Sequence, residues 1–460
     1  MIITRQSCHN SPFRTGPGEV NPPERASGNT KAVEAGGDPV ADWARSGVVA
    51  LTGRLDGPPL VPPGRAASLA RELAAEFAEL TGVRVNGPRL LSERAAFTGC
   101  RRRGAVSAGG ACRLLPTADG WAAVSCARPD DPALLGALIS EDVSDDPWPA
   151  LTRWLAGHTG AELAGRAALL GVAAAPVSRG ISGSLDAASP AWVPATSRPL
   201  AGMLVADFSV LWAGPLCAHL LGLAGARVVK VETPWRPDGA RRGDAAFYDL
   251  LHAGHRSVAL DPRTSDGREA MSALVDAADI VIESSRPRAL ARFGLDAAAA
   301  VAAGTTWVSI TAYGRAVDRV GFGDDVAAGS GLVAVDGDGH PVFAGDAIAD
   351  PLTGLTAAVL AARAPRAALL DVAMSDVVAA TLDAAPHGDA SDRLTPSPAA
   401  RRVTSGWVVD TAEGPVRVAW PRRRPVPGKA ADLGEHTAEV LSELRTSKRR
   451  QTAGSDTRSR

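Results

Sequence analysis

The sequence predicts an α/β fold: a Rossmann-like, doubly wound parallel sheet together with a smaller α+β domain. The first observation is the run at 203–232, where an apolar strand, a turn, a helix and a second apolar strand follow one another. Gly214 and Pro215 open that helix, because proline is tolerated at a first helical position and glycine permits the tight turn before it. Gly225 closes the helix. The second observation is that strands and helices alternate from there to residue 372, a spacing that favours a parallel sheet.

The N-terminal part of the chain divides by composition and periodicity. Residues 1–39 are rich in Pro, Gly, Ser and Asn, and we expect a disordered arm. Residues 40–94 are expected to be a partial large-domain-like segment with one amphipathic helix. Residues 95–180 are expected to form the small α+β domain. Residues 181–200, rich in Gly, Ser and Pro, are expected to be a linker.

The helix in the 40–94 segment is expected at 66–81. Its apolar residues recur with helical spacing, and its charged residues occupy the opposite face. SGVVAL at 46–51 also resembles SGLVAV at 330–335, and a Gly-rich turn follows both. Common ancestry of the two halves would explain this similarity, and chance similarity in an Ala/Gly/Val-rich chain is the alternative.

In the small domain we expect a turn and an alternating strand at 117–127, two short helices within 146–171 and a final strand at 172–177. In the domain at 201–445 we expect strand 203–208, helix 214–224, strand 227–231, helix 266–277, strand 279–283, helix 287–292, strand 306–310, helix 351–363 and strand 368–372. Asp266 and Glu269 have the spacing of a capping box. Residues 446–460 are expected to be a disordered basic tail.

Composition argues against several classes of protein. The chain has 49 Lys and Arg against 50 Asp and Glu, so its bulk charge gives no reason to expect nucleic acid or an anionic membrane as a partner. The five cysteines form no C-x-x-C pair, which argues against a zinc ribbon or a thioredoxin-like site. The histidines have no metal-ligand spacing, so we predict no metal. Without a long apolar run or a signal pattern, we expect a cytoplasmic protein.

A set of motifs follows in a recognisable order. The first strand–helix–strand unit contains Asp207, Ala213, Gly214, Pro215, Gly225, Ala226, Lys230 and Glu232 at characteristic places. The later motifs are HRSVALD…GRE…AD at 255–284, GFGDDVAAGSGL at 321–332, AGDAIADPLTGLTAAVLAA at 344–362, LLDVAMSDVV at 369–378 and GEHT at 434–437. In this order they resemble the family III CoA-transferases, the CaiB/BaiF family, over most of residues 200–441.

The chain departs from that family in its architecture. In the family, a small domain of about a hundred residues follows the DVSMxD-like segment, as the resemblance implies, whereas here only about thirty residues separate Asp376 from Gly406. We therefore interpret the chain as a rearranged or fused member. In this interpretation the module at 95–180 substitutes for the missing small domain.

Asp350 is the candidate catalytic residue. It directly precedes Pro351, the expected first residue of a helix, so spacing alone indicates a helix N-cap. The resemblance implies more, because this position matches the nucleophilic aspartate of the family. Its carboxylate would attack the thioester of an acyl-CoA to give an aspartyl mixed anhydride and CoA thiolate. A carboxylic acid acceptor would then take over, and CoA would return to the new acyl group.

Binding of CoA requires cations for its phosphates and an apolar wall for its adenine. We expect the cations near the carboxyl ends of the strands, where ligands bind in such folds. The resemblance adds the first strand–helix turn. The candidate CoA-binding residues are Leu211, Trp212, Ala213, Arg241, Arg242, His255 and Arg256.

The resemblance implies acyl-CoA and a carboxylic acid as substrates, no permanently bound cofactor, and a homodimer. Two alternatives stay open. An acyl-CoA racemase of the same superfamily would carry a G-H-D motif, but the matching positions are Gly323, Asp324 and Asp325, so its histidine is missing. A non-catalytic CoA-binding or scaffolding relative would fit the rearrangement.

Overall fold

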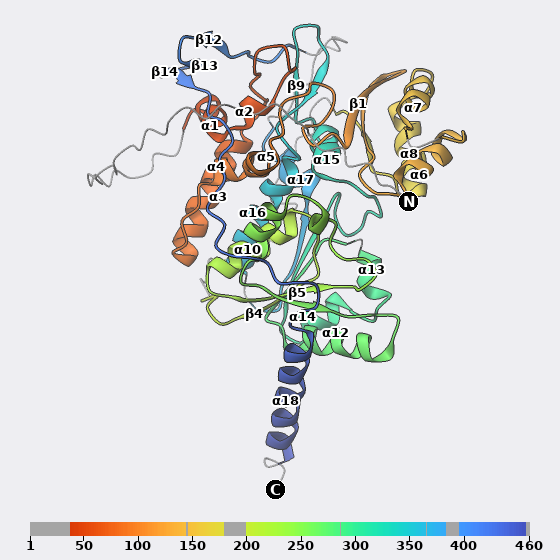
Figure 1. Cartoon of the computed structure of the whole chain (residues 1–460), viewed down its shortest axis with the longest axis vertical. Coiled ribbons are helices and arrows are strands. Elements are labelled where there is room, and N and C mark those ends of the chain that lie inside the picture. Colours follow the sequence, from red (N-terminus) through yellow and green to blue (C-terminus); the bar gives the residue numbers. More distant parts are fainter. Residues whose placement is uncertain are drawn as a thin grey trace, which may run out of the picture.

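A computed structural model describes residues 37–143, 146–178, 199–285, 287–364, 366–382 and 395–456. The arm predicted at 1–39 lies outside the described residues up to residue 36, and so does the predicted linker up to residue 198. Figure 1 shows the whole chain.

The centre of the fold is a six-stranded parallel sheet, which confirms the predicted fold class. Its strands lie in the order β11-β8-β7-β4-β5-β6, and every neighbouring pair is parallel. The strands are β4 (Leu204–Asp207), β5 (Arg227–Glu232), β6 (Arg256–Ala259), β7 (Ile280–Glu283), β8 (Thr306–Thr311) and β11 (Leu369–Ala373). When the six strands are numbered by their order in the sequence, they follow the 3-2-1-4-5-6 order of a doubly wound sheet. The strand order changes direction between β4 and β7.

Helices cover both faces of the sheet. Residues alternate between the faces: Val205 packs into the core under α10 and α16, whereas Leu204 and Ala206 pack into the core under α12 and α18. The helices of this domain are α10 (Ala213–Leu223), α11 (Ala245–His252), α12 (Ser265–Ala277), α13 (Pro287–Ala291), α14 (Ala297–Ala302), α15 (Gly323–Gly329), α16 (Ala349–Arg363), α17 (Met374–Ala379), α18 (Thr437–Asp456) and the 3-10 turn η1 (Gly239–Arg242).

Three local predictions differ from the structure. Helix α12 is capped by Thr264, whose side chain accepts the N–H of Gly267, and not by Asp266. Asp350 is inside α16, because that helix begins at Ala349. The backbone of α18 is helical to Asp456, whereas we predict a disordered tail from residue 446. Figure 1 shows α18 extending away from the sheet at one end of the molecule.

The first helices of the chain belong to the same core as the central sheet. Trp43, Phe77 and Leu91 pack in one cluster with Val205 and Leu352. The helix at 66–81 forms with the predicted bounds. The elements are α1 (Pro39–Ser46), α2 (Val48–Leu51), α3 (Ala66–Thr81), α4 (Gly87–Leu90) and α5 (Glu93–Thr98).

A smaller α+β module follows, with its own hydrophobic cluster. It contains the antiparallel strands β1 (Cys112–Thr117), β2 (Gly120–Ser125) and β3 (Ala174–Pro176) and the helices α6 (Asp131–Ile139), α7 (Trp148–Leu155) and α8 (Gly160–Leu170). Its sheet contacts α15: the Ser125 hydroxyl donates to the Asp325 carboxylate at 2.6 Å. Two antiparallel sheets complete the described chain, β9 (Val333–Val335) with β10 (Pro341–Phe343), and β12 (Arg401–Val403) with β13 (Gly406–Thr411) and β14 (Gly414–Arg417).

Candidate functional site

A buried charge network holds the carboxyl ends of β4 and β5 together. Lys230 Nζ lies 3.7 Å from the carboxylate of Asp207 and 2.9 Å from that of Asp238. All three side chains are buried. Burial alone would lower the pKa of Lys230, but the two carboxylates raise it above its ordinary value, so the ammonium stays charged. The network fixes the turn after β4 against the segment after β5.

The predicted CoA-binding turn lies on top of this network. Leu211 has a φ of 70°, and its N–H donates to Asp238 Oδ1 at 3.0 Å. Leu211 Cδ2 and Arg242 Nη2 lie 3.3 and 3.8 Å from the place where a Cβ on Gly239 would stand. Both side chains are exposed. The structure therefore brings together the apolar Leu211 and the exposed guanidinium of Arg242 at the sheet edge where ligands bind in open α/β folds.

Trp212 connects this turn to a second group of charges. Its buried indole meets Phe247 edge-on, with ring centroids 5.4 Å apart. The guanidinium carbon of Arg94 lies 4.8 Å from the centre of the Trp212 ring. The same guanidinium forms a two-pronged pair with the buried Asp346: Nε lies 2.9 Å from Oδ2, and Nη2 lies 2.5 Å from Oδ1.

Asp350 lies beside this pair, at the second residue of α16. Its carboxylate faces Gly323, where a Cβ would stand only 2.3 Å from Oδ2, so a side chain at position 323 would collide with it. Asp324 accepts the N–H of Ala347 at 2.8 Å. Ala347 has a φ of 46°, a strained conformation for alanine that is found at functional sites when the surroundings enforce it. Asp324 and Asp350 are each only partly buried.

The pKa values of Asp350 and Asp324 are both raised towards neutral pH. Burial raises the pKa of Asp350 to about 7, with the Arg94 guanidinium opposing this and the carboxylates of Asp324 and Asp346 adding to it. Burial, and then the nearby Asp346, raise the pKa of Asp324 to about 6. At neutral pH part of the Asp350 population is ionised, which suits a group that must act as a nucleophile.

Three of the residues predicted to bind the phosphates of CoA are instead paired or buried within the protein. Arg241 pairs with Glu232 at 2.6 Å and covers the Tyr248 ring. Arg256 pairs with Glu443 of α18 at 2.9 Å. His255 is buried beside Gly222 of α10, and burial lowers its pKa to about 3, so its imidazole is neutral. Of the predicted cations, Arg242 is the one that faces the Leu211 turn.

Ala213 has a structural place at the start of α10. Its carbonyl oxygen would stand 2.5 Å from a Cβ at Gly354, so α10 and the first turns of α16 touch through backbone. This contact brings the predicted CoA turn and the candidate nucleophile side by side.

The sequence gives no sign of Arg94, and it indicates the neighbouring Asp324 and Asp346 only weakly. Arg94 is 252 residues away from Asp346 along the chain. It lies in a short helix with no motif around it. The two extra aspartates lie in motifs quoted above, but only the fold shows that they surround Asp350.

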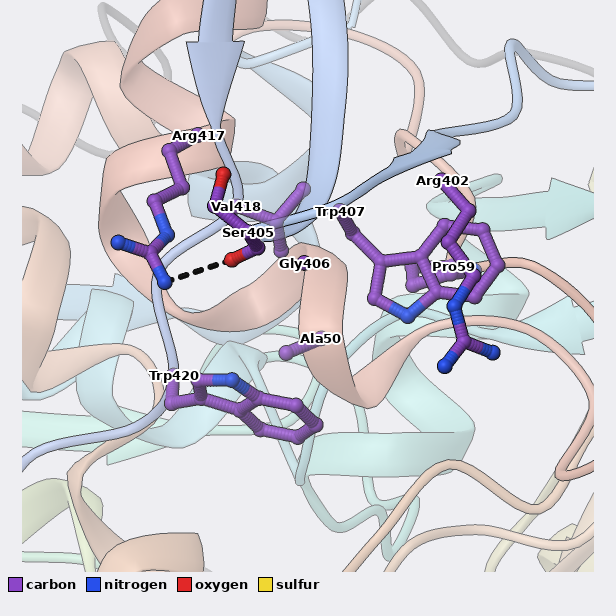
Figure 2. Close-up of a pocket in the computed structure, with 9 residues that line it drawn as sticks. All are labelled: Ala50, Pro59, Arg402, Ser405, Gly406, Trp407, Arg417, Val418 and Trp420. Carbon is purple, nitrogen blue, oxygen red and sulfur yellow. Dashed lines mark hydrogen bonds between the residues drawn. The ribbon is translucent and has the colours of Figure 1, made fainter.

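A separate pocket of about 240 Å³ lies between α2 and the sheet of β13 and β14. Figure 2 shows Trp407, Trp420, Arg402 and Arg417 around it, and Arg417 donates to the carbonyl of Ser405 at 2.7 Å. None of the predicted site residues lines it.

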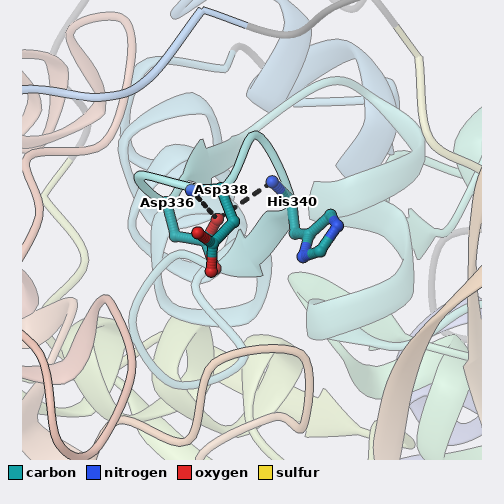
Figure 3. Close-up of side chains that lie close together, drawn as sticks. All are labelled: Asp336, Asp338 and His340. Carbon is teal, nitrogen blue, oxygen red and sulfur yellow. Dashed lines mark hydrogen bonds between the residues drawn. The ribbon is translucent and has the colours of Figure 1, made fainter.

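Asp336, Asp338 and His340 lie together in the turn between β9 and β10 (Figure 3). Asp336 Oδ1 accepts the N–H groups of Asp338 and His340, both at 3.0 Å. Arg54 Nη1 lies 2.9 Å from Asp338 and 3.7 Å from Asp336. These contacts account for the cluster as a turn neutralised by an arginine, and we assign no metal to it.

Within the described parts of the chain, no helix combines the length and the apolar character needed to cross a bilayer.

Comparison with known proteins gives consistent matches to one family. The family CoA-transferase family III matches residues 200–454, more than half of the chain. The succinate–glutarate CoA-transferase of Agrobacterium fabrum is 32% identical over 217 residues, which are 41% of this chain and 54% of that protein. The succinyl-CoA–D-citramalate CoA-transferase of Chloroflexus aurantiacus is 31% identical over 176 residues, 35% of this chain and 44% of that protein.

Among solved structures, a CaiB/BaiF family protein from Brucella suis is similar, with 26% identity and a TM-score of 0.39 over 47% of this chain and 66% of that one. The chain spans about half the length of the curated relatives named above.

Proposed function

Since this chain belongs to CoA-transferase family III, we propose that it moves CoA between an acyl-CoA and a carboxylic acid, with Asp350 as the nucleophile. The observation that carries the proposal is the position of Asp350. Asp350 is a partly buried residue whose carboxyl group has a pKa of about 7, and its helix packs against the helix that follows the turn predicted to bind CoA.

In each step of the proposed reaction, one anion, a carboxylate or the CoA thiolate, replaces another at a carbonyl carbon. A carboxylate oxygen of Asp350 attacks the thioester carbonyl, the C–S bond breaks, and CoA leaves as the thiolate. The acceptor carboxylate then attacks the aspartyl carbonyl and expels the first acid. Finally the thiolate attacks the new acyl carbonyl, which releases the new thioester and restores the Asp350 carboxylate. One anion enters and one leaves in each step, so atoms and charge balance.

We place the CoA end of the substrate at the Leu211 turn. Arg242 offers a guanidinium for a phosphate, and the N-terminus of α10 adds its positive dipole end. Leu211 offers an exposed apolar surface of the kind that adenine or pantetheine requires. The buried Trp212 follows Leu211 in the chain and contacts Arg94, so it links this area to the carboxylate cluster.

The test is Asp350→Asn with Arg242→Ala as its counterpart. We expect Asp350→Asn to lose transfer while its affinity for CoA, measured by titration calorimetry, stays within a few-fold of the wild type. Arg242→Ala should weaken CoA binding instead. Full transfer by Asp350→Asn would contradict the assignment, and unchanged CoA affinity in Arg242→Ala would contradict the placement of CoA.

The pH dependence of the stability of Asp350→Asn shows whether this variant folds. The pKa of Asp350 is raised in the folded protein from 3.8 to about 7, so the wild type loses stability as the pH rises through this window. Asparagine cannot ionise, so at pH values above the window the variant should be at least as stable as the wild type. Loss of activity by unfolding would therefore be recognised.

A second candidate is an α-proton transfer at the same site. Asp324 occupies the position of the histidine in the racemase motif, and its pKa of about 6 lies near that of Asp350. Two carboxyl groups with such pKa values can take up and return a proton. Exchange of the α-hydrogen of a 2-methylacyl-CoA in D₂O, without CoA transfer, would favour this function. CoA binding with neither reaction would favour a scaffold.

A further inference from the structure

An ion pair holds the start of helix α5 in place. Glu93 is buried and accepts two hydrogen bonds from Arg424. Arg424 Nη2 lies 2.7 Å from Glu93 Oε2, and Arg424 Nε lies 2.8 Å from Glu93 Oε1. Arg424 Nη1 also lies 3.1 Å from His219 Nε2 on α10. The next residue, Arg94, therefore starts from a fixed backbone and reaches the carboxylate cluster in a defined direction.

Arg94 has a geometry that a general surface ion pair lacks. Its planar guanidinium donates two hydrogen bonds to Asp346, and its carbon lies over the Trp212 ring, 4.8 Å from the ring centre. Asp346 is fully buried. A pair with one fully buried partner is weak evidence for added stability, because desolvation of the charges offsets their attraction. Its placement calls for another reason.

The reason lies in the balance of charge around Asp350. The charged groups that act on it come from three elements: Arg94 on α5, Asp324 on α15, and Asp346 in the loop before α16. Asp325, which follows Asp324, is turned towards Ser125 of the small module. Three carboxyl groups thus share one guanidinium among the described residues of the cluster. Without that guanidinium, a carboxylate at position 350 would have only like charges for neighbours.

We propose that Arg94 is a positioning residue that ties down Asp346 and neutralises its charge, so that Asp350 is presented to the substrate as a free carboxylate. This rests on the proposed function of Asp350. Arg94 itself does not touch the reacting atoms. It makes the site depend on residues 93–98, which lie outside the part of the chain that matches the family.

The experiment follows the protonation of Asp350 directly, without using activity. Infrared titration in D₂O, taken as the difference between wild type and Asp350→Asn, isolates the protonated carboxyl band of Asp350. We expect a wild-type midpoint of about 7. Arg94→Met should raise the midpoint by about one unit or more, because a positive charge is lost, and Asp346→Asn should lower it, because a negative charge is lost. Arg94→Lys should stay near the wild type.

Arg71→Met is the matched control. Arg71 also pairs with a buried aspartate, Asp42, at 3.1 Å, but on α3 and α1 away from the cluster, so the midpoint should not move. Equal midpoints in the wild type, Arg94→Met and Asp346→Asn would overturn the proposal. If Arg94→Met does not fold, Asp346→Asn and Arg94→Met/Asp346→Asn decide, because a purely structural pair would leave the midpoint unchanged in both.

Failure of the proposed function is recognised separately. If Asp350 titrates as predicted in all variants but no acyl-CoA ever labels it, Arg94 positions a carboxylate that is not a nucleophile. That result would contradict both the proposed function and the role of Arg94 in catalysis. Titration midpoints of Asp350 that do not change between the variants would contradict the Arg94 proposal alone.

Discussion

Single residues decide how Asp350 can react. Its carboxyl group is surrounded by Asp324, Asp346 and Arg94, with the backbone of Gly323 against it. Burial and like charge raise its pKa, and the Arg94 guanidinium and the backbone N–H of Gly323 lower it. The result is a pKa of about 7, at which the ionised form is available at neutral pH.

This pKa predicts the pH dependence of the first chemical step. The attacking form is the carboxylate, so the rate of CoA thiolate release in a single turnover should rise as the pH increases through about 7. Coupling to Asp324 should broaden the rise towards about 6. Stopped-flow mixing with a thiol reagent measures this rate. A rate that is constant or falls across this window would contradict the assignment of the ionised Asp350 as the nucleophile.

The sequence identifies Asp350 but not the residues that control it. The motif around Asp350 and Gly354 is local, so it can be read from the chain. Arg94 reaches the site only in the folded chain, where Arg424 links Glu93 of α5 to His219 of α10 and Arg94 itself pairs with Asp346. The reverse holds for His255. It was predicted to bind CoA because it lies at a strand end, but it is buried in the structure and burial keeps its imidazole neutral.

At the scale of helices and strands, the site depends on how closely α10 and α16 approach. A Cβ at Gly354 would lie 2.5 Å from the carbonyl oxygen of Ala213 and 3.1 Å from Leu216 Cβ. Glycine inside a helix normally lowers stability by about 0.5–1 kcal/mol relative to alanine. Here the close packing of the two helices outweighs that cost.

Gly354→Ala should therefore destabilise the protein, by about 1–3 kcal/mol, because it overpacks a closed interface. Gly165→Ala is the control: Gly165 is an exposed residue within α8 with no atom within 4 Å of its Cβ position, so alanine should stabilise by about 0.5–1 kcal/mol. Urea unfolding of both variants measures the difference. A Gly354→Ala protein as stable as Gly165→Ala would show that α10 and α16 are not in backbone contact.

The strands and helices that the sequence predicted in the central domain lie within about two residues of the observed ones, since buried apolar runs between turns are strong local signals, whereas strand β6 and helix α11 were not predicted. Strand β5 and helix α3 illustrate this. Helix α15 and the strands β9 and β10 could not be predicted, because they are short and depend on distant contacts: α15 contacts β2, β3 and α17, and β10 contacts β1.

At the scale of the whole molecule, the N-terminal part and the small module are packed onto the family-like domain. Strands β2 and β3 contact α15, and Cys112 and Leu114 share a cluster with Val333 and Phe343. A Cβ at Gly329 would lie 2.7 Å from Ala175 Cβ. These contacts support our proposal that the module at 95–180 substitutes for the small domain that the family carries elsewhere in its sequence.

If so, the chain can be cut between the two parts without separating them. A protease site inserted within residues 179–198 should give two pieces that elute together on a sizing column. Gly329→Val in the same protein should weaken their association, because it places methyl groups against Ala175. Elution of the pieces as two stable monomers without that substitution would contradict the proposed role of the module.

The most direct test of the central claim is hydroxylamine trapping during turnover. An aspartyl mixed anhydride reacts with hydroxylamine, so a protein incubated with an acyl-CoA and hydroxylamine should carry a hydroxamate on the peptide that contains Asp350. Peptide mass spectrometry, with Asp350→Asn as the blank, locates it. We predict the hydroxamate at Asp350 and at no other aspartate. A hydroxamate at Asp324 or Asp346 instead, or none with any acyl-CoA that the protein binds, would contradict the account.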